Sequence, residues 1–182
     1  MKYTLIAVSA FLLFSTSRVT AEIQWKIDKP YLNNPLTTAT IEGVGEYRGI
    51  SGKVWLTLAC RKDAPPVRVT LQAENTLAAQ FPVRVFEGPG AAGEKARLVS
   101  ARVGKQTLQR AWYSSGWFQE HNVFAWSFAL QEAELKRWIN AKDSSLTLYV
   151  EVPAKEVTRL TAVFTLPPVT GPLRQVVVPC MK

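Results

Sequence analysis

Residues 111–128 read AWYSSGWFQEHNVFAWSF, the densest apolar cluster of the chain outside its N-terminal segment. Within it, Phe124, Trp126 and Phe128 alternate with smaller residues, which is the period of two expected of a strand with one buried face. Aromatic rings bury a large area each and stabilise strand pairs when they lie opposite one another. We therefore predict that two strands of the core meet in this stretch.

The segment between these two strands, Ser114–His121, is predicted to be a polar connection and is a candidate binding loop. Trp117 and Phe118 are adjacent, so they cannot both face the same side of an extended chain. An exposed aromatic side chain often marks a binding surface, whereas two aromatics that fold inward only add to the core. Both alternatives stay open, and the candidate binding residues are Ser114, Ser115, Trp117, Phe118 and His121.

Alternation of apolar and polar residues predicts further short strands along the chain. These strands are Glu22–Asp28, Thr37–Tyr47, Lys53–Cys60, Val67–Ala73, Phe81–Phe86, Ala96–Val103, Gln106–Tyr113, Leu146–Val152 and Arg159–Leu166. The register of the third strand places Cys60 on the buried face with Val54 and Leu56. The glycine-rich strand Thr37–Tyr47 is expected at a poorly packed sheet edge, where its glycines mark bulges or a close approach of another segment.

One convincing helix is predicted over residues 131–140, because Leu135, Trp138 and Ile139 share one helical face. The tail beyond Thr170 is expected to add about one helical turn from Pro172. Helices do not alternate with strands, which argues against a parallel sheet. The fold class that we expect is mainly β, a single-domain antiparallel β-sandwich or partly open barrel over residues 22–182 with the short helix packed on it.

Residues 1–21 have the pattern of a signal peptide. Lys2 precedes the apolar run Leu5–Phe14, and Val19–Ala21 offers a cleavage site of small residues. The run is too short to span a bilayer, although an N-terminal membrane anchor remains the alternative. Cleavage would give a mature chain that begins at Glu22, without a transmembrane segment, in the periplasm or outside the cell.

Cys60 and Cys180 are the two cysteines of the chain. In an oxidising compartment such a pair most simply forms one disulfide, whereas two separate buried thiols are the alternative. Two cysteines and one histidine cannot supply a closed tetrahedral set of zinc ligands. We expect neither a metal nor a cofactor.

A catalytic centre of the Ser–His–Glu type would have to use His121, the only histidine, with Glu120 and Ser114 or Ser115. Glu120 and His121 are adjacent, and adjacent side chains of an extended chain point apart. Ser115 also lacks the G-x-S-x-G surroundings of a nucleophile elbow. No pair of carboxylates can be matched from the sequence as a glycosidase requires. We therefore predict no catalytic residues and a protein that is not an enzyme.

The chain is basic, with 22 Lys and Arg against 14 Asp and Glu and a formal net charge of +8. A positive sheet face would favour an acidic glycan, peptidoglycan stems, lipid headgroups or an acidic protein, whereas a merely solubilising charge is the alternative. Nucleic acid is not expected as a partner, because no recognition motif is visible and the chain is predicted to be exported.

The order of features over Lys53–Cys180 resembles that of the type VI secretion system-associated TagO/VasI-like periplasmic proteins. The features that carry the resemblance are Cys60 followed by Arg61-Lys62, Val67–Leu71, Val83–Val85, Trp112–Ser115, Trp138-Ile139, Leu146–Val152, Ala162–Leu166 and the closing Cys180. The chain departs from the pattern at Val176–Pro179, where a clearer helix is expected. The resemblance implies a non-enzymatic accessory protein of the cell envelope and no catalytic residues.

The leading hypothesis is therefore an exported, non-enzymatic accessory or binding protein of the bacterial cell envelope that recognises a cell-wall component or an envelope protein. The alternative is an inhibitor or immunity protein that blocks a cell-wall-degrading enzyme with a loop such as Ser114–Trp117. The basic charge counts against a basic target enzyme, because like charges oppose association.

Overall fold

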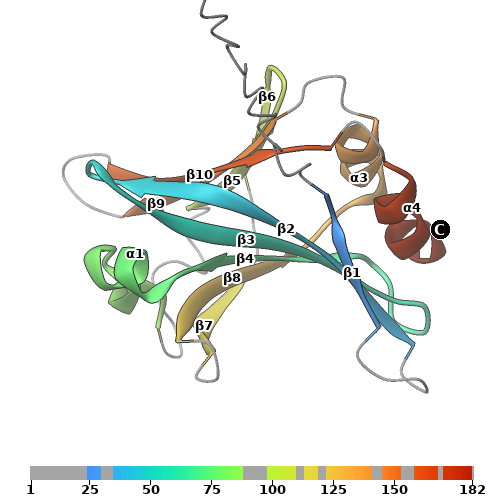
Figure 1. Ribbon diagram of the computed structural model, residues 1–182, viewed down its shortest axis with the longest axis horizontal. Helices are drawn as coiled ribbons and strands as arrows, with labels where there is room; N and C mark the ends of the chain where they lie inside the picture. The colour runs from blue at the N-terminus through green and yellow to red at the C-terminus, as the bar shows by residue number, and fades with distance from the viewer. Residues whose placement is uncertain are drawn as a thin grey trace, which may run out of the picture.

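The computed structural model describes residues 24–29, 35–87, 98–109, 113–118, 122–140, 145–152, 158–167 and 170–181. The strands in these ranges are β1 (Lys26–Asp28), β2 (Leu36–Tyr47), β3 (Ile50–Arg61), β4 (Arg68–Ala73), β5 (Val99–Val103), β6 (Gln106–Gln109), β7 (Ser114–Phe118), β8 (Val123–Ala129), β9 (Ser145–Val152) and β10 (Thr158–Thr165). They form one antiparallel sheet in the order β6-β5-β9-β10-β2-β3-β4-β8-β7, with β1 paired to β2. The sheet curls into a partly open barrel, which confirms the predicted fold class (Figure 1).

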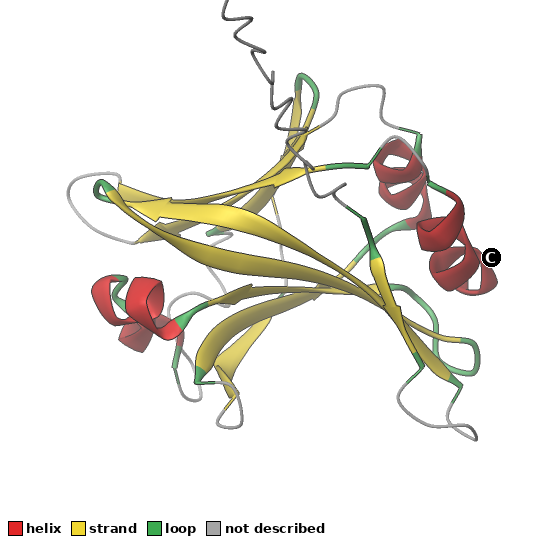
Figure 2. Cartoon of the chain, in the orientation of Figure 1, coloured by secondary structure: helices red, strands yellow, loops and turns green. Residues whose placement is uncertain are grey.

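Short helices lie at two ends of the sheet, as Figure 2 shows. Those described are α1 (Asn75–Gln80), α3 (Glu132–Ile139), α4 (Gly171–Val177) and the 3-10 turns η1 (Val83–Phe86) and η2 (Val178–Cys180). The α3 helix confirms the prediction for residues 131–140, and α4 extends the single turn that was expected near Pro172. Arg174 Nη2 of α4 donates a 2.8 Å hydrogen bond to Asn140 Oδ1 at the end of α3, so these two helices lie together.

The hydrophobic core lies on the inner face of the curled sheet. Val54, Leu56 and Cys60 of β3 are fully buried, while Trp55 and Thr57 between them face outward and are half-buried. The same alternation continues on β4, which pairs with β3, and from Trp126 onward on β8, which pairs with β4. The predicted period of two therefore identified the buried face of these strands correctly.

Trp126 is the centre of an aromatic cluster in this core. It has no exposed surface, and its ring centroid lies 5.6 Å from that of Phe81, 5.8 Å from that of Phe86 and 5.0 Å from that of Phe124. All three contacts have the edge-to-face geometry that the charge distribution of aromatic rings favours. The aromatic stretch therefore organises the core as expected, together with rings that come from outside it.

The prediction of a strand over Phe81–Phe86 is wrong. This segment follows α1 and contains the 3-10 turn η1, in which Val83 and Phe86 are buried. Residues three apart lie one above the other in a 3-10 helix, so this pair faces the core without an extended chain. Phe81, Val83 and Val85 recur every second residue, and this period led to the prediction of a strand. Val83 and Phe86 also have the three-residue spacing of a 3-10 helix, which is the spacing that the structure uses.

The expectation that Thr37–Tyr47 is an edge strand is also wrong. β2 occupies the middle of the sheet, where it pairs with β3 along its whole length and with β10 and β1 on its other side. Its glycines do mark close approaches, as expected. A Cβ on Gly43 would lie 2.5 Å from Phe164 Cδ1, so only glycine leaves room for this ring of β10.

The predicted connection between two core strands is itself a strand over most of its length. β7 begins at Ser114 and pairs with β8, so that Ser115 lies opposite Trp126 and Trp117 lies opposite Phe124. Trp117 and Phe124 also meet through their rings, whose centroids are 5.3 Å apart. Cross-strand aromatic contact of this kind stabilises the pairing, which explains why a short, glycine-containing segment is extended.

Candidate binding surface

The predicted binding residues at 114–118 lie on β7, at one end of the strand order. Ser114 and Gly116 belong to the outer face of the sheet, whereas Ser115 and Trp117 belong to the inner side. Ser115 Oγ donates a hydrogen bond to the carbonyl oxygen of Phe86. The strand therefore separates the candidates onto two faces instead of presenting them together on one loop.

Trp117 is the exposed aromatic residue among these candidates, with 38% of its surface accessible. Its Nε1 donates a 2.7 Å hydrogen bond to Glu87 Oε1, which holds the indole at the rim of the aromatic cluster. Of the two alternatives left open, an exposed aromatic side chain is therefore present at Trp117. The side chain of Phe118 and the whole of His121 lie outside the described residues, so their roles stay predictions.

Cys60 and Cys180 form the predicted disulfide, with their Cα atoms 5.8 Å apart. Cys60 ends the buried row of β3, and Cys180 lies in η2 with 5% of its surface exposed. The bond ties α4 to the central part of the sheet. The alternative of two separate thiols is excluded.

The outer face of the sheet carries a continuous row of hydroxyl groups that the sequence patterns did not single out. The row, which we call the hydroxyl row, crosses five neighbouring strands in register and consists of Thr40, Thr57, Thr70, Ser127 and Ser114. Thr40 Oγ1 lies 2.9 Å from Thr57 Oγ1, and Thr70 Oγ1 lies 2.8 Å from Ser127 Oγ. The hydroxyls therefore form two hydrogen-bonded pairs across β2–β3 and β4–β8.

A shallow depression of about 460 Å³ lies on one side of this row. We call it the Trp55 depression; it is lined by Thr40, Trp55, Thr57, Gln72 and Val123. Trp55 and Gln72 are directly opposite each other on β3 and β4, and both are half-buried. The depression thus combines an aromatic ring with groups that donate and accept hydrogen bonds, the composition typical of sites for polar organic ligands. Glu42, directly opposite Trp55 on β2, borders it and is paired with Lys53 at 3.0 Å.

A second depression, of about 340 Å³, lies on the other side of the row. We call it the Arg68 depression; its lining includes Leu36, Ala59, Arg61, Pro66, Arg68 and Ala129. Arg68 is exposed and lies opposite Ala59 and Ala129, whose small side chains leave its guanidinium uncovered. No acidic side chain of the described residues pairs with it.

Arg61, the other cation of this depression, is already paired. Its Nε and Nη2 donate hydrogen bonds of 3.0 and 3.1 Å to the two carboxylate oxygens of Asp63. These hydrogen bonds lower the pKa of Asp63 and raise the pKa of Arg61. Since both side chains are exposed, the pair holds the turn after β3 only weakly, and Arg68 remains the cation available to an anionic group.

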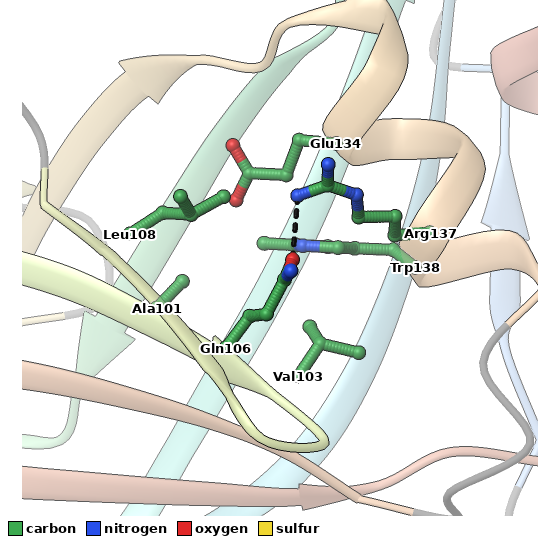
Figure 3. Close-up of a pocket in the computed structure, with 7 residues that line it drawn as sticks. All are labelled: Ala101, Val103, Gln106, Leu108, Glu134, Arg137 and Trp138. Atoms are coloured by element: carbon green, nitrogen blue, oxygen red, sulfur yellow. Dashed lines mark hydrogen bonds between the residues drawn. The ribbon is translucent and has the colours of Figure 1, made fainter.

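A third pocket lies between α3 and the strands β5 and β6, and Figure 3 shows its lining. Arg137 Nη1 donates a 2.7 Å hydrogen bond to Gln106 Oε1 across it, and the buried residues Glu134 and Trp138 form part of its wall. Its volume is about 10 Å³, which holds about one water molecule. This space therefore belongs to the packing of α3 and not to a ligand site.

Within the ranges that the structure describes, no three His, Cys, Asp or Glu side chains are grouped so that they could hold a metal ion. Searching the described helices for one long and apolar enough to cross a bilayer gives no candidate. The outer face of β2, β3, β4, β8 and β7 is therefore the candidate functional surface. The sequence feature that could have pointed to this surface is Trp55, a large aromatic residue at a position where alternation predicts an outward, polar side chain.

Comparison of the chain with family models, with curated proteins and with solved structures finds no match in any of the three. The resemblance to TagO/VasI-like proteins therefore stays a prediction.

Proposed function

We propose that the chain is an exported, non-enzymatic binding protein of the bacterial cell envelope that acts in the periplasm, as an accessory of a secretion system. The observation that carries the proposal is the buried disulfide between Cys60 and Cys180. Disulfides of this kind persist in oxidising compartments and are rare in the reducing cytosol. The apolar segment Leu5–Phe14 and the small residues Val19–Ala21 support the same route, because they have the pattern of a cleavable signal peptide.

A binding role is supported by the outer face of the sheet. The Trp55 and Arg68 depressions lie on the two sides of the hydroxyl row, so aromatic, hydroxyl and cationic groups are contiguous there. The association with a secretion system rests on the resemblance alone. The absence of enzymatic activity rests on the sequence, in which the only histidine has no suitably placed partner.

The export proposal is tested by fractionating cells that produce the full chain with a C-terminal epitope. We expect the chain in the periplasmic fraction, with an N-terminus at Glu22 by mass spectrometry and with Cys60 and Cys180 oxidised. The control is a variant in which two arginines interrupt the apolar run Leu5–Phe14. This variant should stay in the cytosol with reduced thiols. Retention of the unaltered chain in the cytosol, with residues 1–21 intact, would contradict the proposal.

A second candidate function is inhibition of a cell-wall-degrading enzyme, and the exposed indole of Trp117 favours it. This side chain lies on β7, at the end of the strand order, and aromatic residues of this exposure often anchor protein partners. Capture of a wall hydrolase by the unaltered chain and loss of that capture in Trp117→Ala would support inhibition. If hydrolase activity is the same with and without an excess of the chain, this candidate is eliminated.

A further inference from the structure

The two depressions on the outer face follow the direction of β3 and β4. Trp55 and Gln72 lie at one end of this band, Thr57 and Thr70 lie two residues further along, and Arg68 lies beyond them. From Gln72 to Arg68 the strand advances four residues, or about 13 Å at the usual rise of a β-strand. A ligand that contacts both Trp55 and Arg68 must therefore be elongated.

Trp55 provides a flat apolar surface in a polar setting. Its indole is half-buried, and the depression around it is lined by hydroxyl and amide groups of Thr40, Thr57 and Gln72. The charged neighbour of Trp55 on β2, Glu42, is neutralised by an ion pair of 3.0 Å with Lys53. A sugar ring has the complementary character, since its C–H face is weakly apolar and its rim carries hydroxyls. Such a ring lies flat on an indole while the surrounding polar groups fix its orientation.

Arg68 adds a requirement for negative charge. Its guanidinium is exposed and has no acidic partner among the described residues, whereas the neighbouring Arg61 is occupied by Asp63. A guanidinium binds a carboxylate through two parallel hydrogen bonds, with a planar geometry that suits this group. Removal of residues 1–21 takes away Lys2 and Arg18 and leaves 20 basic against 14 acidic residues, an excess that would also attract an anionic polymer over a longer range.

An apolar partner suits this surface less well. The large hydrophobic residues that are exposed on the outer face include Val44 and Val163, which face each other on β2 and β10. Neither valine lines the Trp55 or the Arg68 depression. Between the two depressions the surface consists of hydroxyl groups, which favour a hydrated, hydrogen-bonding ligand.

We propose that the outer face of β3 and β4 binds a glycan chain that carries free carboxylates, with one sugar ring on Trp55 and a carboxylate on Arg68. This inference rests on the proposed function and names its ligand class. The source to which we assign it is the cell-wall glycan strand from which the stem peptides have been removed, because the proposed function places the chain in the cell envelope. A polyuronate shares the required chemistry and is the competing outcome of the test.

The test is calorimetric titration of the full chain, produced with its disulfide formed, against three probes. The probes are wall glycan strands freed of stem peptides by an amidase, polygalacturonate oligomers of similar length, and uncharged N-acetylglucosamine oligomers. We expect the wall glycan to bind about tenfold more tightly than the uncharged probe, and to lose this advantage in high salt. Tighter binding of polygalacturonate than of the wall glycan would overturn the assignment to the cell wall.

Three variants resolve the contributions of the two depressions. Trp55→Ala should weaken binding of every glycan by about tenfold, whereas Trp55→Phe should retain most of the affinity. Arg68→Gln should lower the affinity for the carboxylated probes and leave the affinity for the uncharged probe unchanged. Val163→Ala is the matched control, because Val163 is exposed on the same face outside both depressions. Thermal unfolding of each variant confirms that the fold is intact.

The inference is overturned if neither carboxylated glycan binds, if Trp55→Ala and Arg68→Gln bind as well as the unaltered chain, or if free stem peptides compete for this face as strongly as glycans. Such a result leaves the proposed function standing when fractionation finds the oxidised chain in the periplasm. A reduced chain in the cytosol would instead refute the proposed function, whatever the titrations show.

Discussion

Leu77 of α1 packs directly on Gly45 of β2. A Cβ added to Gly45 would lie 2.5 Å from Leu77 Cδ2 and 2.6 Å from Val54 Cγ1, both well inside van der Waals contact. Leu77 and Val54 have no exposed surface, so neither can move aside without disturbing the core. The absence of a side chain at Gly45, near the C-terminal end of β2, is therefore what lets α1 cover this end of the curled sheet.

The substitution Gly45→Ala should for this reason destabilise the protein. We expect a loss of about 1–3 kcal/mol in the free energy of unfolding, the usual cost of inserting a methyl group into a filled core. Urea denaturation monitored by tryptophan fluorescence measures it. Gly116→Ala on β7 is the matched strand control, because nothing lies within 4 Å of the added Cβ. Equal stability of the two variants would show that α1 does not depend on this contact.

Removal of the disulfide should destabilise the chain. The double variant Cys60→Ala, Cys180→Ala is expected to lose about 2–5 kcal/mol, because the bond restricts the unfolded chain between two positions 120 residues apart. Denaturation with and without dithiothreitol provides the measurement. The unaltered chain should be weakened by the reductant, and the double variant should not respond. A response of the double variant would point to an effect of the reductant other than disulfide reduction.

Trp126→Ala should be among the most damaging substitutions of the core. Because Trp126 is fully buried among Phe81, Phe86 and Phe124, its truncation is expected to cost about 3–5 kcal/mol. Trp126→Phe should cost less, since it keeps a ring and removes an indole N–H that has no hydrogen-bond partner among the described residues. Trp117→Ala, at an exposed position, provides the comparison in the same denaturation assay. A cost as large at Trp117 as at Trp126 would contradict this account of the core.

The Arg61–Asp63 pair predicts a small dependence of stability on pH. Hydrogen bonds from Arg61 lower the pKa of Asp63, so the pair stabilises the fold above the ordinary pKa of an aspartate and loses this effect as the pH falls through the lowered value. An NMR titration of the Asp63 carboxyl measures the shift. In Arg61→Gln the pKa of Asp63 should rise toward its usual range. An unchanged midpoint would mean that the two side chains do not pair in solution.

Much of the sheet follows from local sequence patterns. Val54, Leu56 and Cys60 alternate with outward residues, and this alternation alone places Cys60 on the buried face where Cys180 meets it. The helix α3 could be predicted from the sequence for the same reason, because Leu135 and Trp138 recur at helical spacing. In both cases the burial of one face determines the period, so a short window of sequence contains the information.

The segments that the sequence patterns did not predict correctly depend on contacts with residues far away in the chain. α1 spans six residues with Leu77 and Ala78 buried, and two buried residues are too few to show a helical period. Leu77 packs where Gly45 has no side chain, so the position of α1 depends on a residue of β2. The glycines of β2 led to the prediction of an edge strand. They are instead required because Phe164 of β10 packs on Gly43 and Leu77 of α1 packs on Gly45. The hydroxyl row is likewise visible only after five separate strands are placed in register.

The link between Cys60 and Cys180 also has a mechanical consequence. A pulling force applied at Cys180 passes through the sulfur atoms into β3 and does not have to run along the backbone between the two cysteines. Because β3 pairs with β2 along its whole length and with β4 over Val54–Ala59, the load would have to shear the middle of the sheet rather than peel away α4. A tether attached at Cys180 would therefore be resisted by the hydrogen bonds of the central strands rather than by the contacts of α4.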